Sequence, residues 1–110
     1  MRKTITMAMA SYSLTVFVGP AEYSRFRKRF MVVTGKSIPV EPLDEHGNTV
    51  GGLACLQNIW IQELKASLLA HEALHAIEIL HTHIGITISP GSVDELKAYQ
   101  LQYVLESFGF

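Results

Sequence analysis

Residues 62–83 read QELKASLLAHEALHAIEILHTH and decide how the whole chain is interpreted. The stretch contains neither Gly nor Pro and is rich in residues of high helix propensity. Its most apolar face carries Ala66, Leu69, Ala73, Ala76, Ile77 and Leu80. Because a helix that is apolar nearly all round is usually buried, the sequence predicts a central helix that ends at Gly85.

Within this helix, His71-Glu72-Ala73-Leu74-His75 has the pattern HExxH. At about 100° per residue, the two histidines lie about 40° apart, so both imidazoles can reach one metal ion. Glu72 flanks the site and is placed to act on a metal-bound water as a general base. Two histidines and a glutamate on a buried helix are costly without a partner, which favours a metal site. The alternative is a pair of histidines satisfied within the core.

A catalytic zinc ion usually has three protein ligands and one open position, so a third ligand is needed. The candidates are Glu78, His81, His83, Asp94 and Glu95. Glu78 follows His75 on the same helix, and we expect it to hydrogen-bond a ligand histidine or to be an exposed charge. His81 and His83 lie at the end of the helix, where a cation is favoured without any metal.

Residues 92–107 predict a second helix, antiparallel to the first, from which Glu95 can return to the site. Ser92-Val93-Asp94-Glu95 also has the form of a capping box, in which Glu95 bonds back to the backbone of Ser92. Glu95 therefore has two candidate roles, as a cap and as a zinc ligand, and its carboxylate cannot fulfil both.

The N-terminal part predicts a strand followed by a short helix. In residues 4–18, alternate apolar side chains fall on one face of an extended chain, which is typical of a strand. These side chains are Tyr12, Leu14, Val16 and Val18. Gly19-Pro20 ends the strand, and residues 20–31 predict an amphipathic helix that ends before Gly35.

The middle of the chain predicts strands and turns. Residues 44–48 have the composition of a hairpin loop, and residues 49–56 and 58–61 are candidate strands. Gly51-Gly52 indicates a bulge or a close backbone approach. With strands first and two long helices last, the order of elements predicts a single α+β domain over residues 1–110.

Composition limits the class of protein. A chain of 110 residues is enough for one domain, and 48% hydrophobic with 17% charged residues excludes a disordered chain. No apolar run approaches the ~18 residues of a membrane helix, so no membrane partner is expected. A single cysteine, Cys55, excludes an internal disulfide framework and favours a reducing, cytoplasmic location. The start of the chain only faintly resembles a secretory signal, and we expect no cleavage there.

The charge is distributed unevenly along the chain. Residues 1–36 carry seven Lys or Arg against Glu22 alone, whereas the remaining 74 residues carry two against nine acids. The densest cluster is Arg25-Phe26-Arg27-Lys28-Arg29. We expect a solvated helix face, and the alternative is a surface that holds phosphates or an acidic partner.

HExxH followed after 19 residues by a glutamate on a following helix resembles the gluzincin metallopeptidases, the thermolysin-like branch of the zincins. The short chain and Asp94-Glu95-x-x-Ala98-Tyr99 are similar to minigluzincins and to small metallopeptidases of phage and prophage genomes. The resemblance extends over residues 56–104. It implies a small zincin-like fold and a Zn²⁺ ion held by His71, His75 and Glu95. It also implies Glu72 as general base and a peptide or protein substrate.

Two features depart from the gluzincin pattern. Gluzincins place an aspartate four residues after the glutamate ligand, and Tyr99 stands there in this chain. Their transition-state histidine lies in a further C-terminal subdomain, which has no counterpart in residues 1–110. Tyr99, one helical turn after Glu95, is therefore the candidate for stabilising the oxyanion, whereas Tyr103 is expected to pack as an aromatic helix residue.

The sequence therefore predicts a zinc-dependent metalloendopeptidase. In zincins an edge strand beside the active-site helix pairs with extended peptide, and residues 50–56 would supply that strand here, with Gly51-Gly52 leaving room for a substrate backbone. The alternative is a catalytically inactive or latent zinc-binding module of phage type. A further hypothesis is that the chain binds nucleic acid through its basic N-terminal helix, but the sequence does not favour this hypothesis.

Overall fold

The computed structural model describes residues 1–7, 12–83 and 90–110, with side chains for 1–7, 12–82 and 95–110. Within these residues, the sheet is four-stranded and has the order β1-β2-β4-β3. Its strands are β1 (Arg2–Thr6), β2 (Ser13–Val18), β3 (Gly52–Cys55) and β4 (Asn58–Ile61). The helices are η1 (Pro20–Glu22, a 3₁₀ turn), α1 (Tyr23–Thr34), α2 (Ala66–His83) and α3 (Pro90–Ser107). The mixed α and β content expected from the sequence is confirmed.

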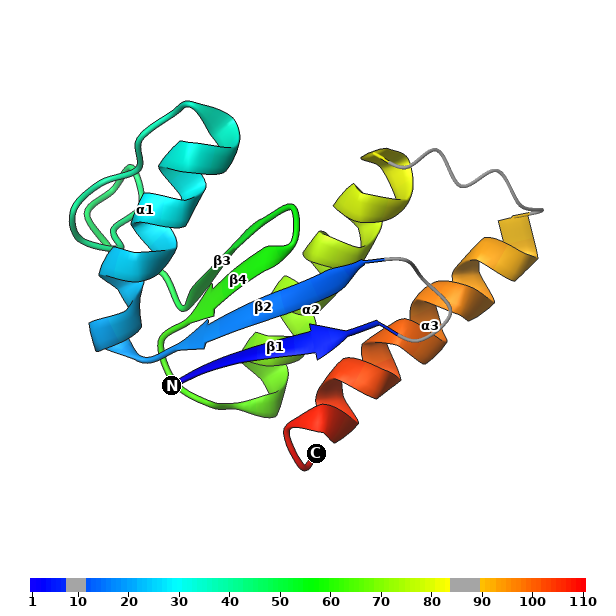
Figure 1. Ribbon diagram of the computed structural model, residues 1–110. Coiled ribbons are helices and arrows are strands. Elements are labelled where there is room, and N and C mark those ends of the chain that lie inside the picture. Colours follow the sequence, from blue (N-terminus) through cyan, green and yellow to red (C-terminus); the bar gives the residue numbers. More distant parts are fainter. Residues whose placement is uncertain (8–11, 84–89) are drawn as a thin grey trace.

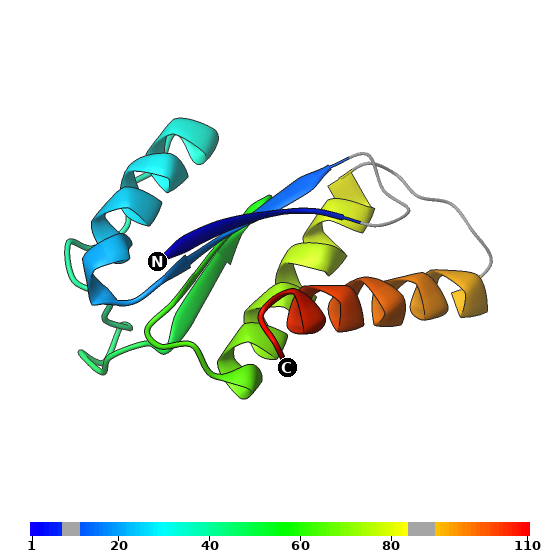
Figure 2. The same ribbon diagram turned by 60° about the horizontal axis from the view of Figure 1, so that its bottom comes forward.

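The helices cover both faces of the sheet. α1 lies on one face, and α2 and α3 lie together on the other (Figures 1 and 2). The central strands β2 and β4 are parallel, and β1 and β3 pair with them antiparallel as the two edge strands. Because β4 leads into α2 and β3 neighbours β4, the edge strand β3 lies beside α2.

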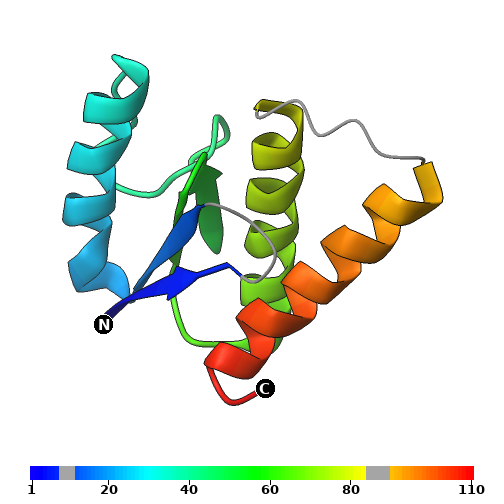
Figure 3. The same cartoon turned by 45° about the vertical axis from the view of Figure 1, so that its right-hand side comes forward.

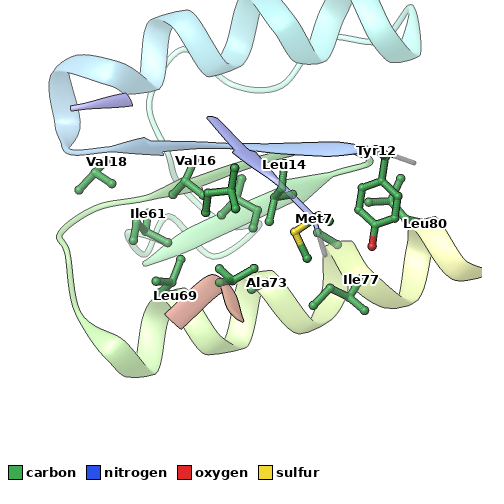
Figure 4. Packing of buried hydrophobic residues seen from close by; sticks show 14 residues of the cluster. Met7, Tyr12, Leu14, Val16, Val18, Ile61, Leu69, Ala73, Ile77 and Leu80 are labelled. Carbon is green, nitrogen blue, oxygen red and sulfur yellow. The ribbon is translucent and has the colours of Figure 1, made fainter. Parts of the chain in front are cut away.

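The larger core lies between the sheet and the two long helices. Leu14, Val16 and Val18 of β2 point into it, with Tyr12 just before the strand, as the alternation predicts (Figure 4). The apolar face predicted for α2 is buried too, apart from Ala66 at its exposed start. Burial of apolar surface is the main force that seats α2 on the sheet.

A second, mostly aromatic cluster joins α1 to the opposite face of the sheet. It consists of Phe17, Tyr23, Phe26, Cys55 and Trp60. The Tyr23 and Trp60 rings meet edge to face with their centroids 4.9 Å apart. α1 ends at Gly35, whose φ of 70° is the left-handed conformation that glycine adopts without strain, so the predicted stop is confirmed.

The single strand predicted over residues 4–18 is wrong. The structure has two antiparallel strands there, β1 and β2, with Ile5 opposite Leu14 and Thr6 opposite Ser13. Both strands direct apolar side chains into the same core, but the core-facing residues are odd-numbered at Ile5 and Met7 and even-numbered from Tyr12 to Val18. With a period of 2, this change of phase indicates two strands rather than one. Residues 8–11 lie outside the described residues.

Two helix starts also differ from prediction. α2 begins at Ala66 instead of residue 62, because the Gln62 backbone N–H donates to the Gly51 carbonyl at 2.9 Å and so extends the sheet contact. α3 begins at Pro90, a residue suited to the first helical position, so Ser92 lies within the helix. The capping box with Ser92 as N-cap is therefore wrong. The predicted stop at Gly85 lies outside the described residues.

The predicted strand at 58–61 is confirmed, and that at 49–56 shortens to β3. Thr49 instead pairs with Leu43 in an isolated bridge that closes the predicted loop at 44–48. Within that loop the Asp44 carboxylate accepts from the backbone N–H groups of His46 and Asn48. Among the described helices, none combines the length and apolar character needed to cross a membrane.

Candidate metal centre

His71 and His75 lie one turn apart on the exposed side of α2, so the prediction that these histidines are buried on a central helix is wrong. Their Nε2 atoms are 3.2 Å apart and their rings meet at 79°. Two nitrogens that bind one tetrahedral zinc ion at ~2.0–2.1 Å are separated by about 3.3–3.4 Å. The two imidazoles therefore already have nearly the spacing that a shared ion requires. Without an ion, one ring N–H donates to the other ring nitrogen.

Glu72 is buried between α2 and the edge strand β3. It is 8% exposed, and its Oε1 lies 3.7 Å from Nε2 of His71. The strand can pass this close because residue 52 is a glycine, and a Cβ there would lie 2.7 Å from Cγ of Glu72. The close approach predicted at Gly51-Gly52 is therefore confirmed, but Leu68 and Glu72 occupy the space that was expected to admit a substrate backbone.

Burial changes the acid–base behaviour of Glu72. Desolvation raises the pKa of its carboxyl, while the neighbouring His71 and His75 act in the opposite direction. A carboxyl in such a place holds a proton more readily than an exposed one. This is the property that a general base needs when it later returns the proton to a leaving group.

The two flanks of α2 have different neighbours. Leu68 and Glu72 contact β3, whereas His81 contacts α3 through a 2.7 Å hydrogen bond between its Nε2 and Oε1 of Gln100. At about 100° per residue, His71 and His75 lie between these two flanks, nearer the β3 side. The metal-binding candidates of α2 thus point away from α3.

α3 directs its predicted site residues to solvent. Its buried face carries Gln100 (1% exposed) and Val104 (0% exposed). Glu95 lies about 140° from Gln100 around the helix and is exposed, and Tyr99 is 58% exposed. Glu95 and Tyr99 share a face, as predicted, but the structure does not bring that face to the histidine pair.

Within the described side chains, no third His, Cys, Asp or Glu joins His71 and His75 in a metal-binding group. Glu78 is exposed on the following turn of α2. The side chains of His83 and Asp94 lie outside the described residues. The ligand role of Glu95 stays a prediction, because it depends on which face α3 presents.

His81 is part of a buried network that the sequence did not reveal. Gln100 Oε1 accepts from Tyr12 Oη at 3.2 Å as well as bonding His81, so three elements share one amide oxygen. His81 is 4% exposed and joins α2 to α3. The interpretation of His81 as a cation at the helix end gave no sign of this, because its partner lies 19 residues away in the chain.

Comparison of the chain with protein-family models, with curated proteins and with solved structures finds no match. The resemblance to gluzincins therefore stays a prediction.

Proposed function

We propose that this protein is a zinc-dependent metallopeptidase in which His71 and His75 bind zinc and Glu72 is the general base. The observation that carries the proposal is the pair of Nε2 atoms 3.2 Å apart, with a buried carboxylate beside them. Imidazole nitrogen is a preferred ligand of zinc. When bound, zinc supplies Lewis acidity, which lowers the pKa of water and polarises a carbonyl group.

Glu72 performs the proton transfers in this proposal. Its Oε1 lies 3.7 Å from Nε2 of His71, so it can accept a proton from a water molecule held beside the histidines. The same oxygen then donates that proton to the leaving amine. The backbone of β3 packs closely against the Glu72 side chain at Gly52, where a Cβ would lie 2.7 Å from Cγ of Glu72.

The unpaired edge of β3 is an argument for a peptide as substrate. Within the described residues, β3 pairs with β4 on one side only, so its other edge offers backbone N–H and C=O groups next to α2. An extended peptide that adds to this edge would run beside the histidines of α2. The peptide backbone itself would then be recognised, and a pocket for one side chain is not required.

A second candidate is a zinc-binding module that is inactive or latent. Catalytic zinc sites usually have three protein ligands, and the described side chains bring only His71 and His75 together. The His71, His75 and Glu95 set implied by the resemblance forms only if α3 turns its exposed face towards α2. Tyr99, on that same face, would come with it.

Zinc analysis combined with peptide digestion tests both candidates. The purified chain should hold about one zinc ion, and a peptide library should be cleaved, with loss on chelation and recovery on zinc addition. The double variant His71→Ala, His75→Ala should lose both properties, while His46→Ala, an exposed histidine elsewhere, should keep them. Zinc binding without cleavage would favour the inactive module, and no zinc uptake would overturn both candidates.

A further inference from the structure

A polar cavity of about 470 Å³ lies on the α1 side of the sheet, at the end where β2 and β4 begin. Its walls include the hydroxyl side chains of Thr6, Ser13 and Thr15, together with Arg29, Gln57 and Asn58. Small-molecule sites in proteins have volumes of roughly 300–1,000 Å³, so the cavity is large enough for a metabolite. The histidine pair of α2 lies on the opposite face of the sheet.

The floor of the cavity is polar, whereas the part of the same sheet face under α1 carries the aromatic residues Phe17 and Trp60. Along β2, Ser13 and Thr15 line the cavity, whereas Phe17, the next residue on that face, is buried under α1. The hydroxyl of Thr15 shares a 3.1 Å hydrogen bond with that of Thr4 on β1, which does not line the cavity. The floor thus carries hydroxyl groups from two strands, Thr6 of β1 and Ser13 and Thr15 of β2.

Arg29 of α1 reaches over this floor. Its Nη1 lies 3.4 Å from Oδ1 of Asn58, and its guanidinium carbon lies 6.0 Å from the ring centroid of Phe17. Asn58 is 4% exposed, so the guanidinium contacts a buried amide at the bottom of the cavity. Among the described side chains, no carboxylate lies within 4.0 Å of Arg29. Its charge is therefore available to a ligand.

The part of the chain that supplies Arg29 and the hydroxyl groups carries an excess of positive charge. Residues 1–36 contain seven Lys or Arg and one acid, Glu22. Glu22 lies before α1, in η1, where it pairs with Arg25 at 3.1 Å, and Arg29 stands one turn further along α1. The lining residues include no Asp, Glu, His or Cys, so the cavity lacks the side chains that divalent cations prefer as ligands.

We propose that this cavity binds a small phosphorylated molecule, with the phosphate on Arg29 and on the hydroxyls of the floor. A guanidinium fork and hydroxyl donors are the groups that recognise phosphate oxygens through short, charge-assisted hydrogen bonds. The cavity is much larger than a phosphate ion, and the neutral amides of Gln57 and Asn58 suit a polar, uncharged remainder such as a sugar. This inference does not depend on the zinc site.

Calorimetric titration of the full chain tests the proposal, with ribose 5-phosphate as probe and ribose as its neutral control. Ribose 5-phosphate should bind and ribose should not. Arg29→Gln should weaken binding at least about tenfold, because a hydrogen bond to a charged group is lost. Lys28→Gln removes the same charge from the next residue, which is exposed and does not line the cavity, and should change binding less than about twofold.

Thr15→Val separates a built site from general attraction between charges. It keeps the β-branched shape and every charge but removes one floor hydroxyl, so binding should weaken several-fold. Equal losses in Arg29→Gln and Lys28→Gln, with none in Thr15→Val, would overturn the proposal. So would tight binding of a single-stranded oligonucleotide without binding of ribose 5-phosphate, or no response to any phosphate probe.

Discussion

α2 and α3 have the same length of 18 residues and pack on the same face of the sheet, but they hold their predicted site residues in opposite ways (Figure 3). α2 places Glu72 against the edge strand and keeps its two histidines together. α3 buries Gln100 and Val104 and leaves Glu95 and Tyr99 in solvent. The half of the site that lies within one helix is assembled by helix geometry, whereas the other half depends on which face the second helix buries.

The largest expected effect is a loss of peptidase activity from a substitution in the α2 half of the site that leaves zinc binding unchanged. If the metallopeptidase proposal is correct, Glu72→Gln, which keeps the shape of the side chain but removes the base, should lower peptidase activity by about 10²–10⁴-fold or more. Zinc content should stay unchanged, measured by elemental analysis of the same sample. Glu63→Gln, an exposed glutamate just before α2, is the matched control and should retain full activity. Undiminished cleavage by Glu72→Gln would remove Glu72 from the mechanism.

The next effect tests the α3 half. If the metallopeptidase proposal is correct and α3 contributes the third ligand, Glu95→Gln should lower zinc affinity by about 100-fold or more, because glutamine is an uncharged and poor ligand. Competition with a chromogenic chelator measures this loss. Glu106→Gln on the same helix should leave the affinity unchanged. Equal affinities for the wild type and Glu95→Gln would mean that α3 keeps its exposed face, which favours the inactive module.

Two glycine substitutions test how closely residues 51 and 52 pack against α2. A Cβ at residue 52 would lie 2.9 Å from the backbone oxygen of Trp60 as well as 2.7 Å from Glu72, so Gly52→Ala should destabilise the fold by about 1–3 kcal/mol. At Gly51 the nearest atom is the end of the flexible Leu68 side chain, at 2.8 Å. Gly51→Ala should therefore cost less than about 1 kcal/mol. Urea unfolding measures the free energy of unfolding of both variants. Equal losses of stability would show that residue 52 is packed no more tightly than residue 51.

The smallest effect is a pH dependence that belongs to α2 alone. Because burial raises the pKa of Glu72, the metal-free folded state binds its proton more tightly than the unfolded chain. This contribution to stability is complete below the unfolded pKa of about 4.3 and is lost as pH rises through the folded pKa. Chelator-treated Glu72→Gln should therefore gain stability relative to the wild type between acidic and neutral pH. A constant difference across this range would show that Glu72 is not desolvated.

Some elements could be read from local pattern, and others could not. The strand at 58–61, the apolar face of α2 and the stop of α1 at Gly35 each follow from side-chain periodicity or from one special backbone conformation. The hairpin of β1 and β2 is indicated by a change of phase, because the core-facing residues are odd-numbered at Ile5 and Met7 and even-numbered from Tyr12 to Val18. The prediction of a single strand rested on the even-numbered residues alone. The late start of α2 was missed because the Gln62 N–H is used by Gly51, a contact between separate segments.

The candidate sites divide in the same way. That His71 and His75 meet follows from the sequence, because a spacing of four residues on a helix fixes their separation. The burial of Glu72, the bond between His81 and Gln100, and the position of Arg29 over a polar cavity all depend on tertiary packing. Contacts within one helix follow from backbone geometry, which sequence spacing reports. Contacts between elements depend on which faces are buried together, and that choice is made by the packing of the whole chain.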